Sequence, residues 1–245
     1  EFRDVSFSYN PHDEAEEVPD CLSHISVALK KGESLGIIGS TGCGKTTIIN
    51  LLMRFYDVDQ GDVLIEGRNV QTFELAELRK HFGVVFQNDV LFADTIFENI
   101  NFGRGLTREE VTTAAEYAQA LPFIENLSKG FDSEVAAMGT NFSGGQKQRM
   151  LISRALAAHP EILILDDSSS ALDYKTDASL RKALREHFTG TTSIIVAQRI
   201  SSIYQCDHVM VLEDGQCVGY GTHEELMENC EIYREIHESQ MRAEA

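Results

Sequence analysis

The chain has 245 residues, with 21 Lys and Arg against 39 Asp and Glu, so its formal net charge is −18. Such an acidic chain is not expected to bind nucleic acid, which requires a basic face, or to be held on anionic lipid by its own surface. Its 42% hydrophobic and 24% charged residues are typical of a globular protein with a sizeable core.

Two further features concern the setting of the protein. No apolar run approaches the roughly 20 residues of a membrane span. The chain opens on Glu1 without a signal-peptide pattern, so we expect a segment of a longer protein. The cysteines lack zinc-like spacing and the density of a disulfide scaffold, which favours a reducing, cytosolic setting. They are Cys21, Cys43, Cys206, Cys217 and Cys230.

Short apolar runs alternate with longer helical patterns, which indicates an α/β protein with a largely parallel sheet. The first two runs alternate apolar and polar residues and predict antiparallel, half-exposed strands. Asp214-Gly215 is a strong hairpin signal between the last two runs. Strands are expected at residues 2–8, 25–29, 34–38, 83–86, 162–165, 193–197, 208–212 and 216–219.

Helical patterns and a loop fill the intervals between these strands. Helices are expected at 47–53, 107–126 and 143–158, the last of them stopped before Pro160. Thr222 and Glu225 have capping-box spacing and would open a terminal helix. Residues 10–20 contain two prolines and five acids and predict a solvated loop.

A phosphate-binding loop is indicated by the pattern G-x-x-x-x-G-K-T, which follows one apolar run and precedes a helical stretch. Its glycines let backbone N–H groups turn towards phosphates, and the start of the next helix adds positive potential. We expect Lys45 to reach the β- and γ-phosphates and the Thr46 hydroxyl to bind Mg²⁺. The predicted cofactor-binding residues of the loop are Gly39, Ser40, Thr41, Gly42, Cys43, Gly44, Lys45, Thr46 and Thr47.

A carboxylate suited to the same cation follows the apolar run at residues 162–165. Ligand sites of open α/β sheets lie at the carboxyl ends of the strands. We therefore expect Asp166 to hold the Mg²⁺ shell.

The segment Phe142-Ser143-Gly144-Gly145-Gln146 resembles the signature, usually LSGGQ, of the ATP-binding cassette (ABC) family, the nucleotide-binding domains of ABC transporters. Ser143 and the two glycines offer hydroxyl and backbone N–H donors at the start of a helix, which makes a second anion site in the chain. The alternative is that Ser143 serves only as a helix cap.

The resemblance covers essentially the whole chain and adds three candidate residues. Tyr9 matches the aromatic residue that stacks on adenine, and Gln87 matches the glutamine that contacts Mg²⁺ and water. Residues 170–173 match the D-loop, which includes Asp173. Taken singly, Tyr9 and Gln87 are more typical of packing and of a strand-end cap. Their order relative to Lys45 is what supports the family roles.

The resemblance also implies a fold and partners. The α/β fold would be a RecA-like P-loop NTPase core with an antiparallel β lobe and an inserted α-helical lobe near residues 88–160, all within one nucleotide-binding domain over 1–245. The implied cofactors are ATP and Mg²⁺. Two cassettes would pair head to tail, each nucleotide lying between one phosphate loop and the other signature. A covalently joined transmembrane domain would place the cassette at the cytoplasmic face of a membrane.

The chain departs from the family pattern at three positions. Directly after the Mg²⁺ aspartate the family has a glutamate that acts as the base, whereas this chain has Asp167. Because Asp is one methylene shorter, its carboxylate oxygen lies about 1 Å or more farther from the attacking water, and such a displacement can lower the rate ~10²-fold. The switch histidine that contacts the γ-phosphate is replaced by Gln198, which donates a hydrogen bond but carries no charge or proton at neutral pH. Ala137 stands where exporters usually have a glutamate before the signature, so cross-talk with the membrane domain is expected to be altered.

The first two departures together resemble the weakened half of heterodimeric ABC exporters, in which one composite site binds ATP with little turnover. The predicted catalytic residues of this site are Lys45, Gln87, Asp167 and Gln198, and the predicted metal ligands are Thr46, Gln87 and Asp166. The chain's own signature would complete the competent site of a consensus partner cassette.

Three alternatives stay open. One is a homodimeric cassette for which Asp167 suffices, and another is a regulatory module that binds ATP without hydrolysing it. The third is a non-transport cassette in DNA repair or translation, which the charge of −18 and the lack of a second phosphate loop disfavour. The transported substrate is not indicated by the sequence.

Overall fold

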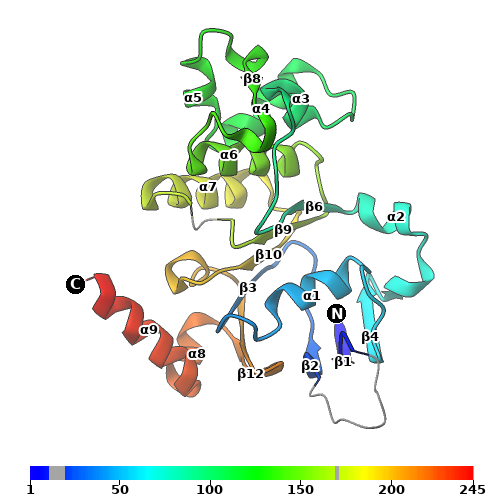
Figure 1. Ribbon diagram of the computed structural model, residues 1–245. Helices are drawn as coiled ribbons and strands as arrows, with labels where there is room; N and C mark the ends of the chain where they lie inside the picture. Colours follow the sequence, from blue (N-terminus) through cyan, green and yellow to red (C-terminus); the bar gives the residue numbers. More distant parts are fainter. Residues whose placement is uncertain (11–19, 169–170, 245) are drawn as a thin grey trace. The chain divides into compact units, whose positions relative to one another are not determined.

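A computed structural model describes residues 1–10, 20–168 and 171–244 (Figure 1). Most of the loop expected at residues 10–20 therefore lies outside the described residues. The chain forms two compact units. The first unit comprises residues 1–80 and 192–245, and the second unit comprises residues 81–191.

An antiparallel sheet opens the first unit, with strand order β2-β1-β4-β5. The expected strand at 2–8 is confirmed, but the one expected at 25–29 begins three residues earlier, at Leu22. His24 has a φ of 53° and interrupts the alternation, so Leu22 and Ile25 are both buried although they are three residues apart. The strands are β1 (Phe2–Phe7), β2 (Leu22–Val27), β4 (Gln60–Ile65) and β5 (Arg68–Asn69).

The other four strands of the first unit lie in the order β12-β11-β3-β10, with β3 parallel to both β10 and β11. Strands β11 and β12 form the expected hairpin, in which Asp214 and Gly215 have φ angles of 43° and 76°. Two successive positive φ angles are what a type I′ turn requires. The strands are β3 (Ser34–Gly39), β10 (Thr192–Val196), β11 (His208–Glu213) and β12 (Gln216–Gly221).

The helices of the first unit lie in two stretches of the sequence, one that begins at the phosphate loop and one near the end of the chain. The Thr222 capping box is confirmed, but the single terminal helix is divided because Cys230 adopts an extended conformation. The helices are α1 (Lys45–Leu52), η1 (Val70–Thr72), α2 (Leu75–Lys80), η4 (Ile200–Ser202), α8 (His223–Asn229) and α9 (Glu231–Glu244).

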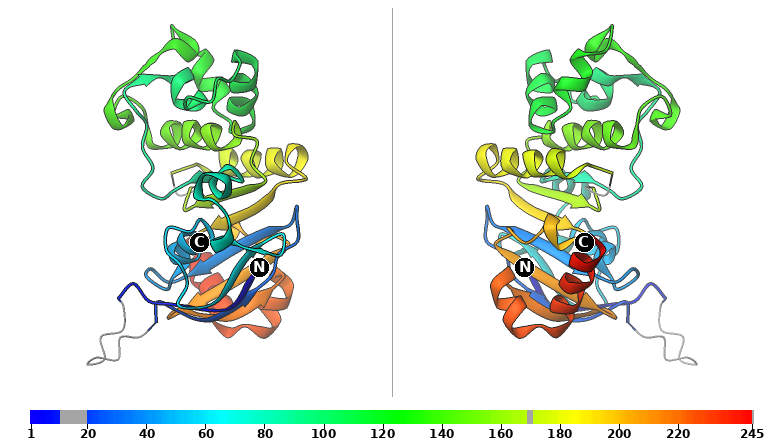
Figure 2. Two further views of the ribbon diagram at one scale, coloured as in Figure 1. Left: turned by 90° about the vertical axis from the view of Figure 1, so that its right-hand side faces the viewer. Right: turned by 90° about the vertical axis from the view of Figure 1, so that its left-hand side faces the viewer.

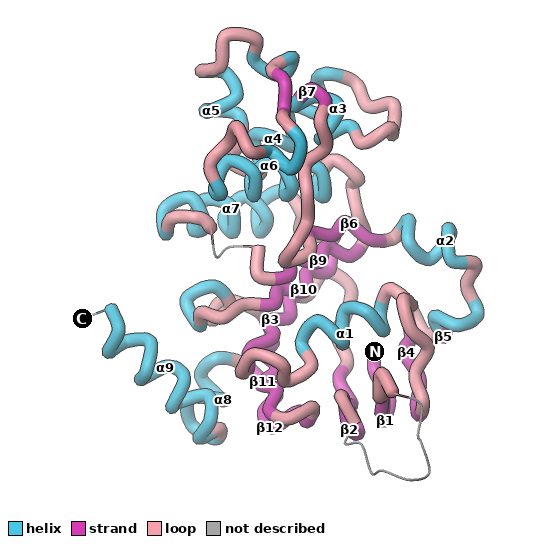
Figure 3. Tube along the Cα trace, viewed as in Figure 1, coloured by secondary structure: helices cyan, strands magenta, loops and turns pink. Residues whose placement is uncertain are grey.

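The second unit contains the parallel pair β6 and β9 and the helices α3 to α7 (Figure 3). Helix α6 packs against α3, α4 and β6, within the green helical part of Figure 2. The short strands β7 and β8 pair with each other. Its elements are β6 (Phe82–Val85), β7 (Asp94–Thr95), α3 (Ile96–Asn101), α4 (Arg108–Tyr117), α5 (Leu121–Glu125), η2 (Gly130–Asp132), β8 (Glu134–Val135), η3 (Ala137–Gly139), α6 (Gly144–Leu156), β9 (Ile162–Asp166) and α7 (Tyr174–His187).

The single helix predicted at 107–126 is wrong, because the chain turns between α4 and α5. Gln119 has a φ of 60°, which ends α4, and Pro122 lies in the first turn of α5, where its missing N–H costs nothing. Arg149 of α6 donates to the Gln119 carbonyl at 2.9 Å. The Gln119 carbonyl, which the turn leaves without a helical partner, is thus hydrogen-bonded by a side chain distant in the sequence.

A buried polar network holds the helices of the second unit together. Arg154 of α6 is 6% exposed, and its guanidinium donates to the Asn99 carbonyl at 2.8 Å and to the Asn99 side-chain oxygen at 3.0 Å. It also donates to the Val90 carbonyl at 3.0 Å and lies 3.6 Å from the Asp89 carboxylate. Residues 89–90, shortly after β6, are thereby fixed to α3 and α6.

Within the described parts of the chain, no helix is both long enough and apolar enough to cross a lipid bilayer.

Candidate functional site

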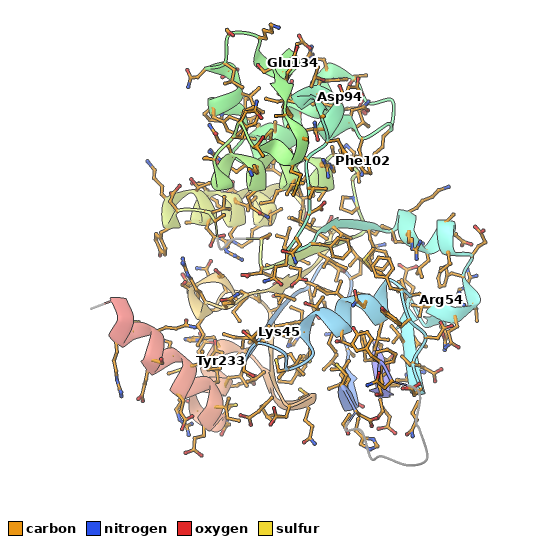
Figure 4. All side chains as sticks on the ribbon, in the orientation of Figure 1. Lys45, Arg54, Asp94, Phe102, Glu134 and Tyr233 are labelled. Carbon is orange, nitrogen blue, oxygen red and sulfur yellow. The ribbon has the colours of Figure 1, made fainter. Side chains whose placement is uncertain are left out.

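The phosphate loop joins β3 to α1 in the first unit, and Lys45 is the first residue of the helix (Figure 4). The Lys45 ammonium donates to the carbonyls of Gly39 at 2.8 Å and Ser40 at 2.6 Å, and it lies 3.6 Å from Cys43 Sγ. These contacts direct its charge across the loop, where a phosphate bound to the backbone N–H groups would meet it.

Two glycines give the loop its path. Gly44 caps α1 with a φ of 105°, and a Cβ there would lie 2.6 Å from Cδ2 of the buried Leu22. Gly42 has a φ of 86° with no atom within 4 Å of a Cβ position. Gly44 makes no side-chain cap, and the N-terminus of a helix is a position that favours an anion. The first turn of α1 carries no acidic residue.

An exposed aromatic surface lies beside this loop. The Tyr9 hydroxyl lies 3.2 Å from the Thr47 hydroxyl and accepts from Asn50 Nδ2 at 3.1 Å. The Tyr9 ring packs edge-on against Phe7 and Tyr56, with centroids 4.9 and 5.0 Å away. Tyr9 and Tyr56 remain 45% and 47% exposed, so they offer aromatic surface to a planar base. Thr47 itself is buried and bonded to Tyr9.

Gln198 follows the end of β10 in the same unit. The last sheet contact before it is the Ala197 N–H donating to the Ile37 carbonyl at 3.1 Å. Gln198 is exposed, whereas Ile200, which begins η4, is buried. The sequence singled out Gln198 but gave no sign of what holds its backbone, since that contact comes from Gln240 in α9.

Two successive carboxylates end β9 in the second unit. Asp166 is only 2% exposed, and a buried carboxylate must be hydrogen-bonded, paired with a cation or bound to a metal. Asp167 is half-buried and has a φ of 48°, a left-handed conformation that Asp tolerates better than most residues. Asp167 therefore lies just beyond β9, outside the regular strand conformation.

The signature begins α6. Ser143 is the N-cap, and its hydroxyl accepts from the Gln146 N–H at 3.3 Å, while the Ser143 N–H donates to Gln146 Oε1 at 2.9 Å. The capping role of Ser143 is therefore present, and its O–H remains a possible donor to an anion. A Cβ on Gly145 would lie 3.1 Å from the Ala171 carbonyl, so the glycine permits close approach of the next loop.

Asp173 ends the predicted D-loop as the N-cap of α7. Its carboxylate accepts from the Thr176 N–H at 3.0 Å and from the Thr176 hydroxyl at 2.7 Å. These hydrogen bonds lower the pKa of Asp173. Ser170, the first residue of the predicted D-loop, lies outside the described residues.

Two other predicted positions lie in the second unit. Gln87 is exposed just after β6, and the Asp89 N–H donates to the Phe86 carbonyl at 3.2 Å, which turns the chain there. Ala137 is exposed at the start of η3, in a loop that Asn141 closes by accepting from the Ala136 N–H at 3.0 Å.

The structure brings Tyr9, the phosphate loop and Gln198 together in the first unit. Gln87, the signature, the two carboxylates and Asp173 belong to the second unit. Sequence reasoning missed Tyr56, Arg154 and Gln240. Tyr56 and Arg154 lie in apolar patterns that hide their contacts, and Gln240 lies in a charged helix.

The donor chemistry of these residues fits a nucleotide and Mg²⁺. The α1 N-terminus and the Lys45 ammonium suit phosphate, and the exposed Tyr9 and Tyr56 rings suit a base. The described residues contain no group of three or more His, Cys, Asp or Glu that could hold a metal. Mg²⁺ commonly needs only one or two carboxylates beside substrate phosphates and water, and the Thr46 hydroxyl and the Asp166 carboxylate are each a type of oxygen ligand that it accepts.

A strand, a glycine loop crossed by a lysine and a helix beginning at that loop define a phosphate-loop nucleotide-binding domain. A family model for ABC transporters matches residues 22–170. The chain belongs to the ABC transporter family. Its fold is that of the family's nucleotide-binding domain, as predicted, and this domain binds ATP.

Two relatives resemble nearly the whole chain. An uncharacterized ABC transporter ATP-binding protein of Bacillus subtilis is 41% identical over 241 residues, which cover 98% of this chain and 39% of the relative. An ATP-dependent lipid A-core flippase of Hahella chejuensis is 40% identical over 242 residues, covering 98% and 40%.

A third relative and a solved structure agree with these two. A putative multidrug export ATP-binding/permease protein of Staphylococcus aureus is 43% identical over 237 residues, covering 96% of this chain and 40% of the relative. A bacterial Atm1-family ABC exporter with ATP bound superposes with a TM-score of 0.91 at 36% identity, covering 98% of this chain and 41% of that one. The chain thus spans about two fifths of the length of these proteins.

Proposed function

We propose that this domain is the energy-coupling cassette of an ABC exporter and that it acts at the cytoplasmic face of a membrane. The proposal is supported by relatives named as a multidrug export protein and a lipid flippase, and by the likeness to an Atm1-family exporter. A transmembrane domain joined to the cassette and a second cassette paired with it are the proposed partners.

The residues of the first unit bind the nucleotide. Tyr9 and Tyr56 receive the base, and the backbone N–H groups at the start of α1 receive the phosphates. The Lys45 ammonium exchanges its long contact with Cys43 Sγ, at 3.6 Å, for the β- and γ-phosphate oxygens. Charge-assisted hydrogen bonds to phosphate are stronger than a contact with a thiol, so this exchange favours binding.

The family pattern supports further roles, which we propose residue by residue. Thr46, Gln87 and Asp166 are the proposed ligands of Mg²⁺, which neutralises charge on the β- and γ-phosphates when bound. Asp167 accepts a hydrogen bond from the attacking water, and Gln198 donates one to the γ-phosphate.

We propose that this cassette's own site hydrolyses ATP slowly, and the observation that carries this proposal is the Asp167 and Gln198 pair. Asp167 begins from a left-handed backbone and has one methylene less than the glutamate of the family pattern. Gln198 replaces an imidazole by a group that carries no proton at neutral pH. The intact signature from Ser143 to Gln146 would complete the site of a consensus partner cassette in a heterodimer.

Single-turnover hydrolysis and ATP binding test this proposal in the wild-type chain, in Asp167→Glu, in Gln198→His and in the double variant. We expect the double variant to hydrolyse ATP at least about tenfold faster than the wild type. The Glu side chain at 167 extends farther towards the water, and the His at 198 can carry a proton. The Kd for ATP should stay within about threefold, since the phosphate loop is unchanged. Lys45→Ala gives the background rate.

The possible results separate the alternatives. A wild-type chain that already hydrolyses as fast as the double variant would show that Asp167 suffices, as in a homodimeric cassette. Tight ATP binding with no turnover in any of the four proteins would identify a regulatory ATP-binding module. Loss of ATP binding only in Lys45→Ala confirms that the measured affinity comes from the phosphate loop.

A further inference from the structure

Helix α9 holds the backbone on either side of Arg199 through one side chain. Gln240 Nε2 donates to the Gln198 carbonyl at 2.7 Å, and the Ile200 N–H donates to Gln240 Oε1 at 2.9 Å. All of these residues lie in the first unit. A single amide thus bonds a carbonyl and an N–H group that are two residues apart.

This arrangement is the one that a residue of a parallel strand makes with its neighbour. The carbonyl can only accept and the N–H can only donate, so one orientation of the Gln240 amide satisfies both. Strand β10 ends at Val196 and is hydrogen-bonded to the parallel strand β3. Two residues beyond this end, the Gln240 side chain makes hydrogen bonds of the same kind with the backbone.

Helix α9 is itself firmly anchored at its start. Tyr233 lies near the start of α9 (Figure 4) and its side chain is fully buried. Its hydroxyl lies 2.9 Å from His223 Nδ1. Arg234 donates to the last carbonyls of α8, at 3.2 Å to Met227 and 2.8 Å to Glu228. A helix fixed in this way can hold Gln240 at a constant place in the first unit.

The Gln240 contact bears on the position of Gln198, which is exposed and lies beyond the end of β10. Core packing fixes the backbone again only at Ile200, which is buried. A hydrogen bond to the Gln198 carbonyl therefore sets the peptide plane from which its side chain projects.

We propose that Gln240 is a positioning residue for Gln198 and that α9 thereby controls the geometry of γ-phosphate contact. This inference rests on the proposed function, since it assumes that Gln198 takes part in hydrolysis. Gln240 touches no reacting atom and acts only through the Gln198 backbone.

Amide hydrogen exchange of the full chain tests the clamp without reference to activity. In Gln240→Ala the Ile200 N–H should exchange about tenfold faster, because it loses its acceptor. In Gln240→Glu it should exchange near the wild-type rate, because the carboxylate still accepts. Ala favours a helix more than Gln does, so α9 is not weakened by the first change. Ser239→Ala, at the exposed neighbouring position, is the matched control.

Single-turnover ATP hydrolysis then tests positioning through a double-mutant cycle. Gln240→Ala should lower the rate about fivefold when Gln198 is present and less than about twofold in Gln198→Ala, where no side chain is left to position. The Kd for ATP should change less than about twofold in every variant. Gln240→Glu should lower the rate although Ile200 stays protected, because a carboxylate repels the Gln198 carbonyl.

Each result decides one part of the proposal. Unchanged exchange at Ile200 in Gln240→Ala overturns the clamp. Equal losses of rate with and without the Gln198 side chain show that α9 supports the fold rather than Gln198, and overturn positioning. If Gln198→Ala hydrolyses at the wild-type rate, or the chain shows no turnover, the proposed role of Gln198 falls, and the positioning falls with it. The exchange result still stands in that case.

Discussion

Replacing Arg154 by Met removes the charged group that joins α6 to α3 and to residues 89–90. The guanidinium donates to two carbonyls, those of Asn99 and Val90, and to the Asn99 side-chain oxygen. Asn99 Oδ1 keeps a second donor, the Phe92 N–H at 2.9 Å. The two backbone carbonyls are the groups that would lose a partner.

The magnitude follows from these contacts. A buried acceptor without a partner costs about 1–3 kcal/mol, and the Asp89 carboxylate 3.6 Å away also loses its cation. Part of this is offset, because burial disfavours the Arg154 charge and lowers its pKa. We therefore expect Arg154→Met to lower the free energy of unfolding of the second unit by about 3 kcal/mol. Arg154→Lys keeps one donor direction and should lose about half as much.

Urea unfolding followed by far-UV circular dichroism measures this loss. Native-state hydrogen exchange of α6 amides shows whether it belongs to the second unit. Lys182→Met is the control, because Lys182 lies in the same unit, is 69% exposed and pairs with Glu186 only at 3.8 Å. The control should lose less than about 0.5 kcal/mol. A loss below about 1 kcal/mol in Arg154→Met would refute the reasoning, since it would mean that water replaces the guanidinium at no cost.

Two further predictions concern the first unit. Burial raises the pKa of Tyr233 to about 12, so the folded state keeps a proton that the unfolded state releases near pH 10. As pH rises from 10 to 12, stability should fall by about 2 kcal/mol more in the wild type than in Tyr233→Phe, as urea midpoints across that range would show. Gly44→Ala should lose about 2 kcal/mol more than Gly42→Ala. Both positions have positive φ, but only the first brings a Cβ against Leu22, and equal urea midpoints for the two variants would contradict this.

Local sequence signals predicted the part of the fold that carries the phosphate loop. Strand β3 is a short apolar run, and the glycines and Lys45 that follow it match the loop that the structure shows. The Asp214-Gly215 turn and the Ser143 cap also depend on neighbouring residues only. Such features are readable because backbone conformation and capping are decided within a few residues.

The features that the sequence did not reveal depend on distant partners. The bulge at His24 shifts β2 because Leu22 and Ile25 must both face the core. The turn at Gln119 is completed by Arg149, thirty positions away. Gln240 contacts Gln198 across about forty residues, and nothing in the pattern of α9 marks it as different from its polar neighbours.

The acidic charge of the chain does not oppose a triphosphate at this loop. Surface charges more than about 8–10 Å away are largely screened at physiological ionic strength. The charges that matter are therefore the local ones, and the first turn of α1 has Lys45 and no acidic residue. The net charge of −18 bears on large polyanions such as nucleic acid, which would contact the whole surface.

The three departures from the family pattern lie outside the buried core. Gln198 and Ala137 are exposed, and Asp167 occupies a left-handed position that Asp tolerates well. The residues that shape the phosphate loop are of a different kind, because Gly44 packs against Leu22 and could not change without loss of stability. If Asp167 and Gln198 slow hydrolysis as proposed, they do so without altering the residues that shape the phosphate loop. The proposed combination of ATP binding with slow turnover is therefore compatible with the packing of the phosphate loop.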